Sequence, residues 1–310
     1  MSDVFNLLLL QNTLRTATPV VLCALGCLMT DQVGIMNIGV DGMMLMGAFF
    51  AVLGSYLFGS WVMGLLFATV LGVLLGLFYY VFSITFKSDE FIIGVALNIL
   101  AGGLTVFLLR TLFGVKGSFS SPGIVPLPTI HIPWLERIPL LGPILSGNTL
   151  LVYVSWVLVA VCWAFLYKTP LGFHLRASGE APEALRASGK SPERMKRLAS
   201  VLCGVLASIS GAHLSLGYLT MFSENMSASR GYVAVACVIF GGSNPPRVFL
   251  AALLFGFIDA LGMRLQKYIP SEITSMAPYV VTVVMMVAVV VLRQHRQAAR
   301  ERASRTLSEQ

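Results

Sequence analysis

Long uninterrupted apolar segments leave this chain few ways to fold. They occupy residues 5–29, 42–59, 61–86, 91–113, 149–167, 198–216, 248–265 and 275–293. Each is close to the roughly 20 residues that a helix needs to cross the hydrocarbon layer of a bilayer. Only 11% of the residues are charged, against about a quarter in soluble domains. No segment alternates apolar and polar residues as a membrane β-strand does. The sequence therefore predicts an all-α, polytopic integral membrane protein.

Two shorter apolar pieces, 31–41 and 230–242, contain glycine and polar residues. Irregular backbone at membrane depth is tolerated only where protein or water covers it, so both pieces are typical of broken or re-entrant segments. We expect eight transmembrane helices, or ten if both short pieces cross. The first segment lacks basic residues in front of it and a clear cleavage site, which favours a retained span over a signal peptide.

Basic residues predict the orientation. The loop 168–197 holds seven Lys and Arg, and the tail that starts at Arg293 holds five Arg, together 12 of the 21 basic residues. By the positive-inside rule we expect both the loop and the 294–310 tail to be cytoplasmic, and the 114–148 loop to be external. Parity then favours ten crossings with the N-terminus inside. The net charge of +7 is explained by topology and anionic lipid, so no nucleic acid partner is expected.

Five cysteines all fall within apolar segments: Cys23, Cys27, Cys162, Cys203 and Cys237. None has metal-site spacing, and their odd number argues against a disulfide framework, so we expect small core residues. No His, Cys or carboxylate pair has convincing metal spacing, and no catalytic set is apparent. We predict neither a metal site nor catalytic residues.

The stretch NIGVDG, residues 37–42, interrupts apolar sequence with an amide and a carboxylate. In one interpretation it is a discontinuous helix, and Asn37 and Asp41 line a translocation pathway, since an acidic residue in a span must face water or a partner. In the other, the glycines pack helices together and Asp41 is the N-cap of the helix that follows it. Both interpretations stay open from the sequence.

Asn98 and Asp259 also lie inside apolar segments. Each is a candidate for the pathway. Alternatively, Asn98 bonds a neighbouring helix, and Asp259 forms an ion pair with Arg264, five residues further on. His213 is a lone histidine among small residues, for which we expect a packed and hydrogen-bonded imidazole.

The basic loop contains a short helix-forming run around Glu183, with Pro182 where the first helical residue would be. Such a helix suits a membrane surface or a groove in a soluble partner. The chain has no G-x-x-x-x-G-K-[ST] pattern. If nucleotide energises the protein, a separate chain must hydrolyse it.

Three motifs together resemble the permease subunits of bacterial ABC importers: NIGVDGMMLMGAFF, RASGEAPEALRASGKSPERMK and SRGYVAVACVIFGGSNPPRVFLAALLFG. The resemblance covers roughly residues 10–293 and is closest to nucleoside-type permeases. Asp41 stands where those permeases carry Glu. The resemblance implies a single permease domain over residues 1–310, a cytoplasmic ATPase that uses ATP-Mg, a second permease subunit and an extracytoplasmic solute-binding protein. It also implies that one set of residues forms the ATPase-coupling loop: Gly179, Glu180, Glu183, Ala184 and Gly189.

We therefore expect a multi-pass permease of the bacterial inner membrane that binds no cofactor itself and imports a small polar solute by alternating access. A nucleoside or a simple sugar fits a pathway with few charges. A branched-chain amino acid permease and an ion-coupled secondary transporter are the alternatives. An integral membrane enzyme is disfavoured, because four scattered histidines form no catalytic cluster.

Overall fold

A computed structural model describes residues 7–133 and 145–266, together with 280 and 284. Within these ranges, seven helices are long and apolar enough to cross a membrane. They are α1 (Leu7–Gln32), α2 (Val40–Phe58), α3 (Trp61–Tyr80) with its π-helical extension η1 (Val81–Thr85), α4 (Glu90–Phe113), α7 (Leu150–Lys168), α10 (Pro192–Ala212) with η2 (His213–Tyr218), and α12 (Pro245–Leu265). They coincide with seven of the eight predicted spans. The eighth, 275–293, and the 294–310 tail lie outside the described ranges, apart from Val280 and Val284.

Local sequence explains where several helices start and stop. Asp89 caps α4, because its Oδ1 accepts hydrogen bonds from the backbone N–H groups of Phe91 and Ile92 at 2.9 and 3.1 Å. Ser191 does the same for α10, with Pro192 in the first turn. Gly114 ends α4 in the left-handed conformation, with φ 68°.

The centre of the bundle is made of α1, α2 and α10, which are largely buried, whereas α3, α4, α7 and α12 flank them and expose most of their surface. Glycines let the backbones approach closely. Gly72 and Gly76 of α3 face Gly204 of α10, where an added Cβ at Gly72 would lie 2.6 Å from Gly204 O. Close approach of this kind is how helices associate in lipid, where burial of apolar surface gives little driving force.

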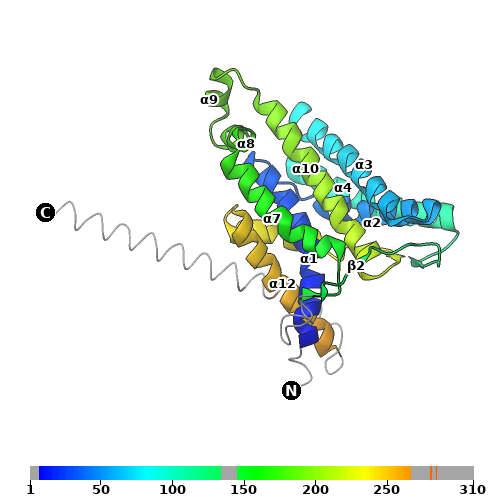
Figure 1. Cartoon of the computed structure of the whole chain (residues 1–310). Helices are drawn as coiled ribbons and strands as arrows, with labels where there is room; N and C mark the ends of the chain where they lie inside the picture. The colour runs from blue at the N-terminus through cyan, green and yellow to red at the C-terminus, as the bar shows by residue number, and fades with distance from the viewer. Residues whose placement is uncertain (1–6, 134–144, 267–279, 281–283, 285–310) are drawn as a thin grey trace.

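Two ends of the bundle are distinguished by the segments they carry (Figure 1). One end, called here the loop end, carries α8 (Pro170–Glu180) and α9 (Pro182–Ala187). The opposite end, called the ribbon end, carries two short antiparallel ribbons. In these, β1 (Ser118–Phe119) pairs with β4 (Phe222–Ser223), and β2 (Thr129–Ile130) pairs with β3 (Asn148–Thr149).

The first described helix begins at the ribbon end, opposite the basic loop, whereas the parity prediction put the start of the first span and the basic loop on the same side. Near the start of α1, Gln11 Nε2 donates to Ser146 O at 3.4 Å and Arg15 Nη2 donates to Gly147 O at 2.8 Å. At the other end of α1, Gln32 Nε2 donates to Ser243 O at 2.9 Å, next to the loop end. If the basic loop end is cytoplasmic, α1 starts outside.

The error in the parity argument has a local cause. The piece 31–41 does not cross the membrane: α1 runs on to Gln32, residues 33–39 form an irregular loop, and α2 begins at Val40. The piece 230–242 is a short helix, α11 (Arg230–Gly241), as expected for a broken segment. Its 12 residues span about 18 Å at 1.5 Å per residue, roughly half of a bilayer.

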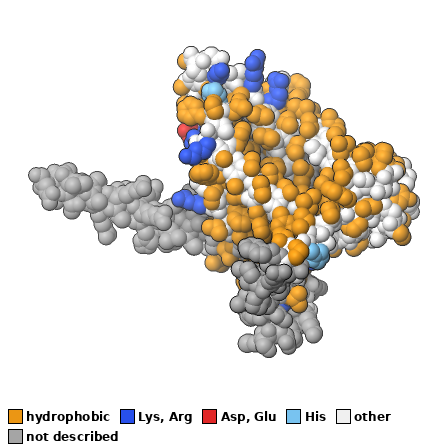
Figure 2. All heavy atoms as spheres, viewed as in Figure 1, with side chains coloured by type: hydrophobic (Ala, Val, Ile, Leu, Met, Phe, Trp, Pro, Cys, Tyr) orange, Lys and Arg blue, Asp and Glu red, His pale blue; other side chains and the backbone are white. Residues whose placement is uncertain are grey.

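The surface agrees with a membrane environment. Figure 2 shows apolar side chains spread over the flank of the bundle and Lys and Arg side chains gathered at the loop end. Exposed apolar residues on α3 and α4 include Leu74, Ile99 and Phe107, at 58%, 71% and 60% exposure. Lipid is the natural solvent for such a flank, because soluble proteins do not leave apolar surface of this extent uncovered.

Candidate functional site

The NIGVDG stretch forms the loop before α2 and the first turn of that helix. The Asn37 side chain is buried, and its Oδ1 accepts a hydrogen bond from Gly39 N at 2.9 Å. This local turn sets the direction in which α2 starts. Asn37 Nδ2 lies 3.4 Å from Cys203 Sγ on α10. Its amide therefore fixes the loop from inside the bundle.

The glycines of the stretch lie where α4 comes closest to α2. A Cβ on Gly42 would lie 2.9 Å from both Asn98 Cα and Leu97 O, and a Cβ on Gly94 would lie 2.8 Å from Gly39 N. Any side chain at these positions would push α4 away. The prediction that these glycines pack helices is confirmed for Gly39 and Gly42.

Asp41 binds the N-terminus of α11 rather than capping its own helix. Its Oδ1 accepts from Gly231 N at 3.0 Å, and its Oδ2 accepts from Ser227 Oγ at 3.0 Å. The residue in the N-cap position of α2 is Gly39, which makes no side-chain cap bond. The own-helix capping interpretation is therefore wrong. A carboxylate at a helix N-terminus is stabilised by free N–H groups and by the helix dipole. The two short pieces of the sequence thus meet at one contact.

Asp259 of α12 forms an ion pair, as one of its two interpretations predicted, but its partner differs from the predicted one. Arg230 Nη2 lies 3.1 Å from Asp259 Oδ2, and the two side chains are 22% and 30% exposed. The partner is Arg230 of α11 rather than the predicted Arg264. The sequence offered a signal for this residue, since an arginine inside an apolar segment needs a partner.

Asn98 joins three segments through one amide. Its Oδ1 accepts from Gly42 N at 2.7 Å, and its Nδ2 donates to Ile38 O at 3.0 Å and to Tyr232 Oη at 2.8 Å. The amide thus ties α4 to the loop, to α2 and to α11. In the sequence, Tyr232 is notable only as a member of the SRGYVAVACVIFGG motif. The structure shows that it binds Asn98 directly.

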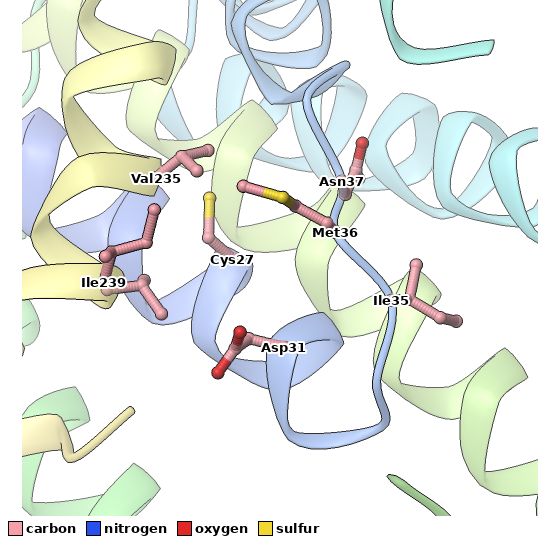
Figure 3. A pocket seen from close by; sticks show the side chains of 8 residues that line it. Cys27, Asp31, Ile35, Met36, Asn37, Val235 and Ile239 are labelled. Atoms are coloured by element: carbon pink, nitrogen blue, oxygen red, sulfur yellow. The ribbon is translucent and has the colours of Figure 1, made fainter. Parts of the chain in front are cut away.

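A narrow cleft opens beside the loop, between the end of α1 and α11 (Figure 3). Figure 3 shows Met36 directed from the loop toward Val235, and Cys27 and Asp31 on the neighbouring α1. The cleft has a volume of about 20 Å³, room for about one water molecule. In this conformation no solute fits at this point.

The predicted coupling residues lie on and around α8 and α9, and they divide into two groups. Glu180 and Ala184 line a groove of about 430 Å³, together with Arg176, Leu185 and others. Glu183 lies outside the groove lining and pairs with Arg186 at 2.8 Å.

The two predicted glycines have different surroundings. A Cβ on Gly179 would lie 2.5 Å from Gln32 O and 3.0 Å from Gly34 N, so α8 contacts the loop before α2 directly. Gly189 adopts φ 76°, and nothing lies within 4 Å of a Cβ built on it. It therefore serves as a turn residue after α9.

His213 is packed and hydrogen-bonded as predicted. It is 1% exposed, and its ring nitrogens lie 3.5 Å from Thr149 Oγ1 and 3.4 Å from Arg15 O. All five cysteines are buried and free, which confirms the expectation of core residues. In the described part of the chain, no group of His, Cys, Asp and Glu is arranged to hold a metal ion.

These features together define a membrane transport permease: a bundle of long apolar helices, non-helical backbone joined to polar side chains within it, and a grooved, basic end. The chain belongs to the family described as branched-chain amino acid transport system / permease component, whose model matches residues 9–290. It is accordingly a transport component rather than an enzyme.

Several permeases of other organisms are similar over most of the chain. The guanosine ABC transporter permease protein NupQ of Bacillus subtilis is 31% identical, covering 87% of this chain and 88% of its own length. The nucleoside ABC transporter permease protein NupC of Lactococcus lactis is 31% identical, covering 90% and 91%. A putative glucose ABC transporter permease protein of Haloferax volcanii, TsgC13, is 34% identical, covering 84% and 78%.

Each of these three organisms also contributes a second, more distant permease with the same solute in its name, at 25–26% identity. No solved structure matches the chain.

Proposed function

We propose that this chain is one of two permease subunits of an ABC importer that carries a nucleoside. The observation that carries the proposal is similarity over almost the full length to two nucleoside permeases of such systems. The polar groups on α2, α4 and α11 are largely neutral or paired, which suits an uncharged solute that needs hydrogen-bond partners rather than a fixed charge. A glucose-like sugar has the same needs, and the glucose relative makes it the nearest alternative.

The groove at the loop end is the proposed docking site for the ATPase. Its volume of about 430 Å³ suits a helix or loop of a soluble partner inserted between α8 and α9. Glu180 and Ala184 are its members from the predicted coupling set. In this proposal the ATPase alone holds ATP-Mg, and this chain binds no cofactor.

Contacts from α8 offer a route by which ATPase motion reaches the middle of the bundle. Gly179 rests on the backbone of the loop at Gly34, and that loop leads within a few residues to Asp41. Asp41 in turn holds the start of α11 through Gly231. A push on α8 therefore acts on a loop whose other end is bonded to a half-length helix. A ligand-driven shift needs such a contact, one that differs between two states.

We assign the other proposed partners, a second permease, a solute-binding protein and lipid, from the relatives and from the surfaces of the bundle. The matched pairs of permeases in three organisms support a second, non-identical permease subunit rather than two copies of this chain. A solute-binding protein would dock at the ribbon end, outside the inner membrane, with the loop end and the C-terminal tail cytoplasmic. Lipid covers the apolar flank, and no nucleic acid is involved.

The docking proposal is tested by Ala184→Arg, with Ala184→Ser as the matched control. An arginine at this position projects into the groove, so uptake of guanosine and co-purification of the ATPase should both fall about tenfold or more, while membrane insertion stays normal. Serine, which is about as small as alanine, should keep both. Full uptake by the arginine variant would exclude the groove as the ATPase contact.

A branched-chain amino acid importer is the second candidate, because the family description names that transport system. Such a solute is a zwitterion and needs a positive and a negative partner along its path. Arg230 and Asp259 are both present but bound to each other. Competition of guanosine uptake by leucine or valine would favour this candidate, and its absence would favour the nucleoside.

An ion-coupled secondary transporter would use carboxylates near the midplane to hold the coupling ion. Asp41 and Asp259 are the two that the sequence offered, and each is engaged by other groups. Uptake that continues after the ATPase is inactivated, and that stops when the ion gradient is dissipated, would favour this mechanism over the ATP-driven one.

A further inference from the structure

Tyr232 presents an aromatic ring to the outside of the chain at membrane depth. It lies in the first turn of α11 and is 42% exposed. Its hydroxyl accepts a hydrogen bond from Asn98 Nδ2 at 2.8 Å. Asn98 is the ninth residue of α4, about 12 Å along that helix at 1.5 Å per residue. The ring is therefore well inside the hydrocarbon layer.

Lipid is a poor cover for this part of the surface. The backbone of residues 36–39 and 224–229 on either side of it is not helical. The Arg230–Asp259 ion pair, which starts two residues earlier on α11, is partly exposed as well. Non-helical backbone and charged groups are costly against hydrocarbon, and both are tolerated where water or another protein covers them. Those are the surroundings of a solute pathway.

Both amide hydrogens of Asn98 are used by structural bonds, which separates its role from that of Tyr232. Both amide hydrogens are donated, to Ile38 O and Tyr232 Oη, and the amide oxygen accepts from Gly42 N. The amide has no hydrogen left for a solute. It instead holds the tyrosine by its hydroxyl, so the exposed face of the ring is presented in a fixed orientation.

A fixed aromatic ring beside a water-accessible path suits a solute with a flat face of its own. Base–aromatic stacking needs no charge and tolerates any base, because every base has a π-face. Val235 and Ile239 follow on the same side of α11, three and seven residues further on, and line the cleft of Figure 3. The aromatic ring, and below it these aliphatic side chains, continue one surface toward the loop end.

We propose that Tyr232 contacts the nucleobase of the solute during its passage, with Asn98 acting as the positioning residue that orients the ring. The inference rests on the proposed nucleoside function and deepens it. It assigns base recognition within the membrane to one side chain, and of the two roles predicted for Asn98 it favours bonding to a neighbouring helix over pathway lining.

The test uses the complete importer, with its second permease, ATPase and binding protein, reconstituted in liposomes. Initial uptake of radiolabelled guanosine is compared in wild type, Tyr232→Leu, Tyr232→Phe and Phe78→Leu. Phe78 is the matched control, because it is 40% exposed and lies on α3, which packs against α2 and α10. Melting temperature and ATPase activity stimulated by the binding protein are recorded for each variant.

Tyr232→Leu should lower guanosine uptake about tenfold, the loss expected for one base–aromatic stack. Tyr232→Phe keeps the ring but loses the bond from Asn98 that orients it, so its loss should be about threefold, clearly smaller than that of Tyr232→Leu. Phe78→Leu should match wild type. Equal losses in the leucine and phenylalanine variants would mean that only the bond to Asn98 matters, which overturns the proposal. Normal uptake by Tyr232→Leu also overturns it. A wild-type importer that carries no nucleoside instead refutes the proposed function.

Discussion

Replacing Gly231 by alanine should separate α11 from α2, because the two helices touch backbone to backbone at this residue. A Cβ on Gly231 would lie 2.5 Å from Asp41 Cα, 2.6 Å from Asp41 N and 2.7 Å from Asp41 Cβ. Carbon atoms that are not bonded prefer about 3.5–4.0 Å, so α11 must move by about 1 Å. The same shift stretches the bond from Gly231 N to Asp41 Oδ1, now 3.0 Å.

The expected cost follows from these two effects. Overpacking a tight contact costs typically 1–3 kcal/mol, and a lost hydrogen bond to a charged group costs about 1.5–3 kcal/mol. Alanine returns about 0.5–1 kcal/mol through its better helix propensity. We expect a net loss of about 3 kcal/mol. For 310 residues, with about 2.1 cal/mol/K of unfolding entropy per residue, this lowers the melting temperature by about 5 °C.

The assay is thermal unfolding of the purified chain in detergent, with Gly103→Ala as the control. Gly103 lies inside α4, and nothing lies within 4 Å of a Cβ built on it, so the same substitution there should be neutral or stabilise by up to about 1 kcal/mol. If Gly231→Ala melts at the wild-type temperature or above, or if both variants lose stability equally, the close contact between α2 and α11 is refuted.

Three further outcomes are expected. Gly179→Ala should reduce uptake while the ATPase still binds, because its Cβ overlaps the backbone before α2 and not the groove; loss of ATPase binding as well would contradict this. Removing either member of the Arg230–Asp259 pair alone should destabilise the chain more than replacing both with apolar residues, since a single change leaves an unpaired charge. Melting temperatures of the two single variants and the double variant check this, and a lower melting temperature for the double variant would contradict it. Gln11→Cys and Glu183→Cys should react with an impermeant thiol reagent from opposite sides of the membrane, and labelling from one side would refute the position assigned to the start of α1.

The class of protein and the membrane spans could be predicted because both depend on hydropathy, which can be summed along a segment without knowing its neighbours in space. Seven of the eight apolar segments are helices within a few residues of the predicted bounds, since a long apolar run in lipid must bond its own backbone. The predicted crossing by residues 31–41 is wrong, because the apolar composition of this piece continues through a loop. Gly34 has φ 73° and the Asn37 side chain bonds the backbone nearby, and neither feature changes hydropathy.

The partners of the polar residues could not be predicted in the same way. Asp41 precedes an apolar run as an N-cap does, yet its partners lie 186 and 190 residues away. Asp259 has an arginine five residues along its own helix, yet it binds Arg230. Which groups these side chains bind is determined by the packing of helices that are distant in sequence. Three of the four pathway candidates, Asn98, Asp41 and Asp259, bind around the start of α11; that they line the pathway stays a prediction.

The central position of α1 bears on how the chain is made. Among the described helices, α1 is synthesised first, and it packs against α10, α11 and α12, which come last. At about 5–20 residues per second, the synthesis of residues 33–265 takes on the order of 10–50 s. Until then a helix that ends with Thr30, Asp31 and Gln32 waits in the bilayer without its final neighbours. Insertion machinery or a lipid-facing intermediate must shelter it through that interval, so truncation before α12 should leave the start of the protein, rather than its end, exposed to proteolysis.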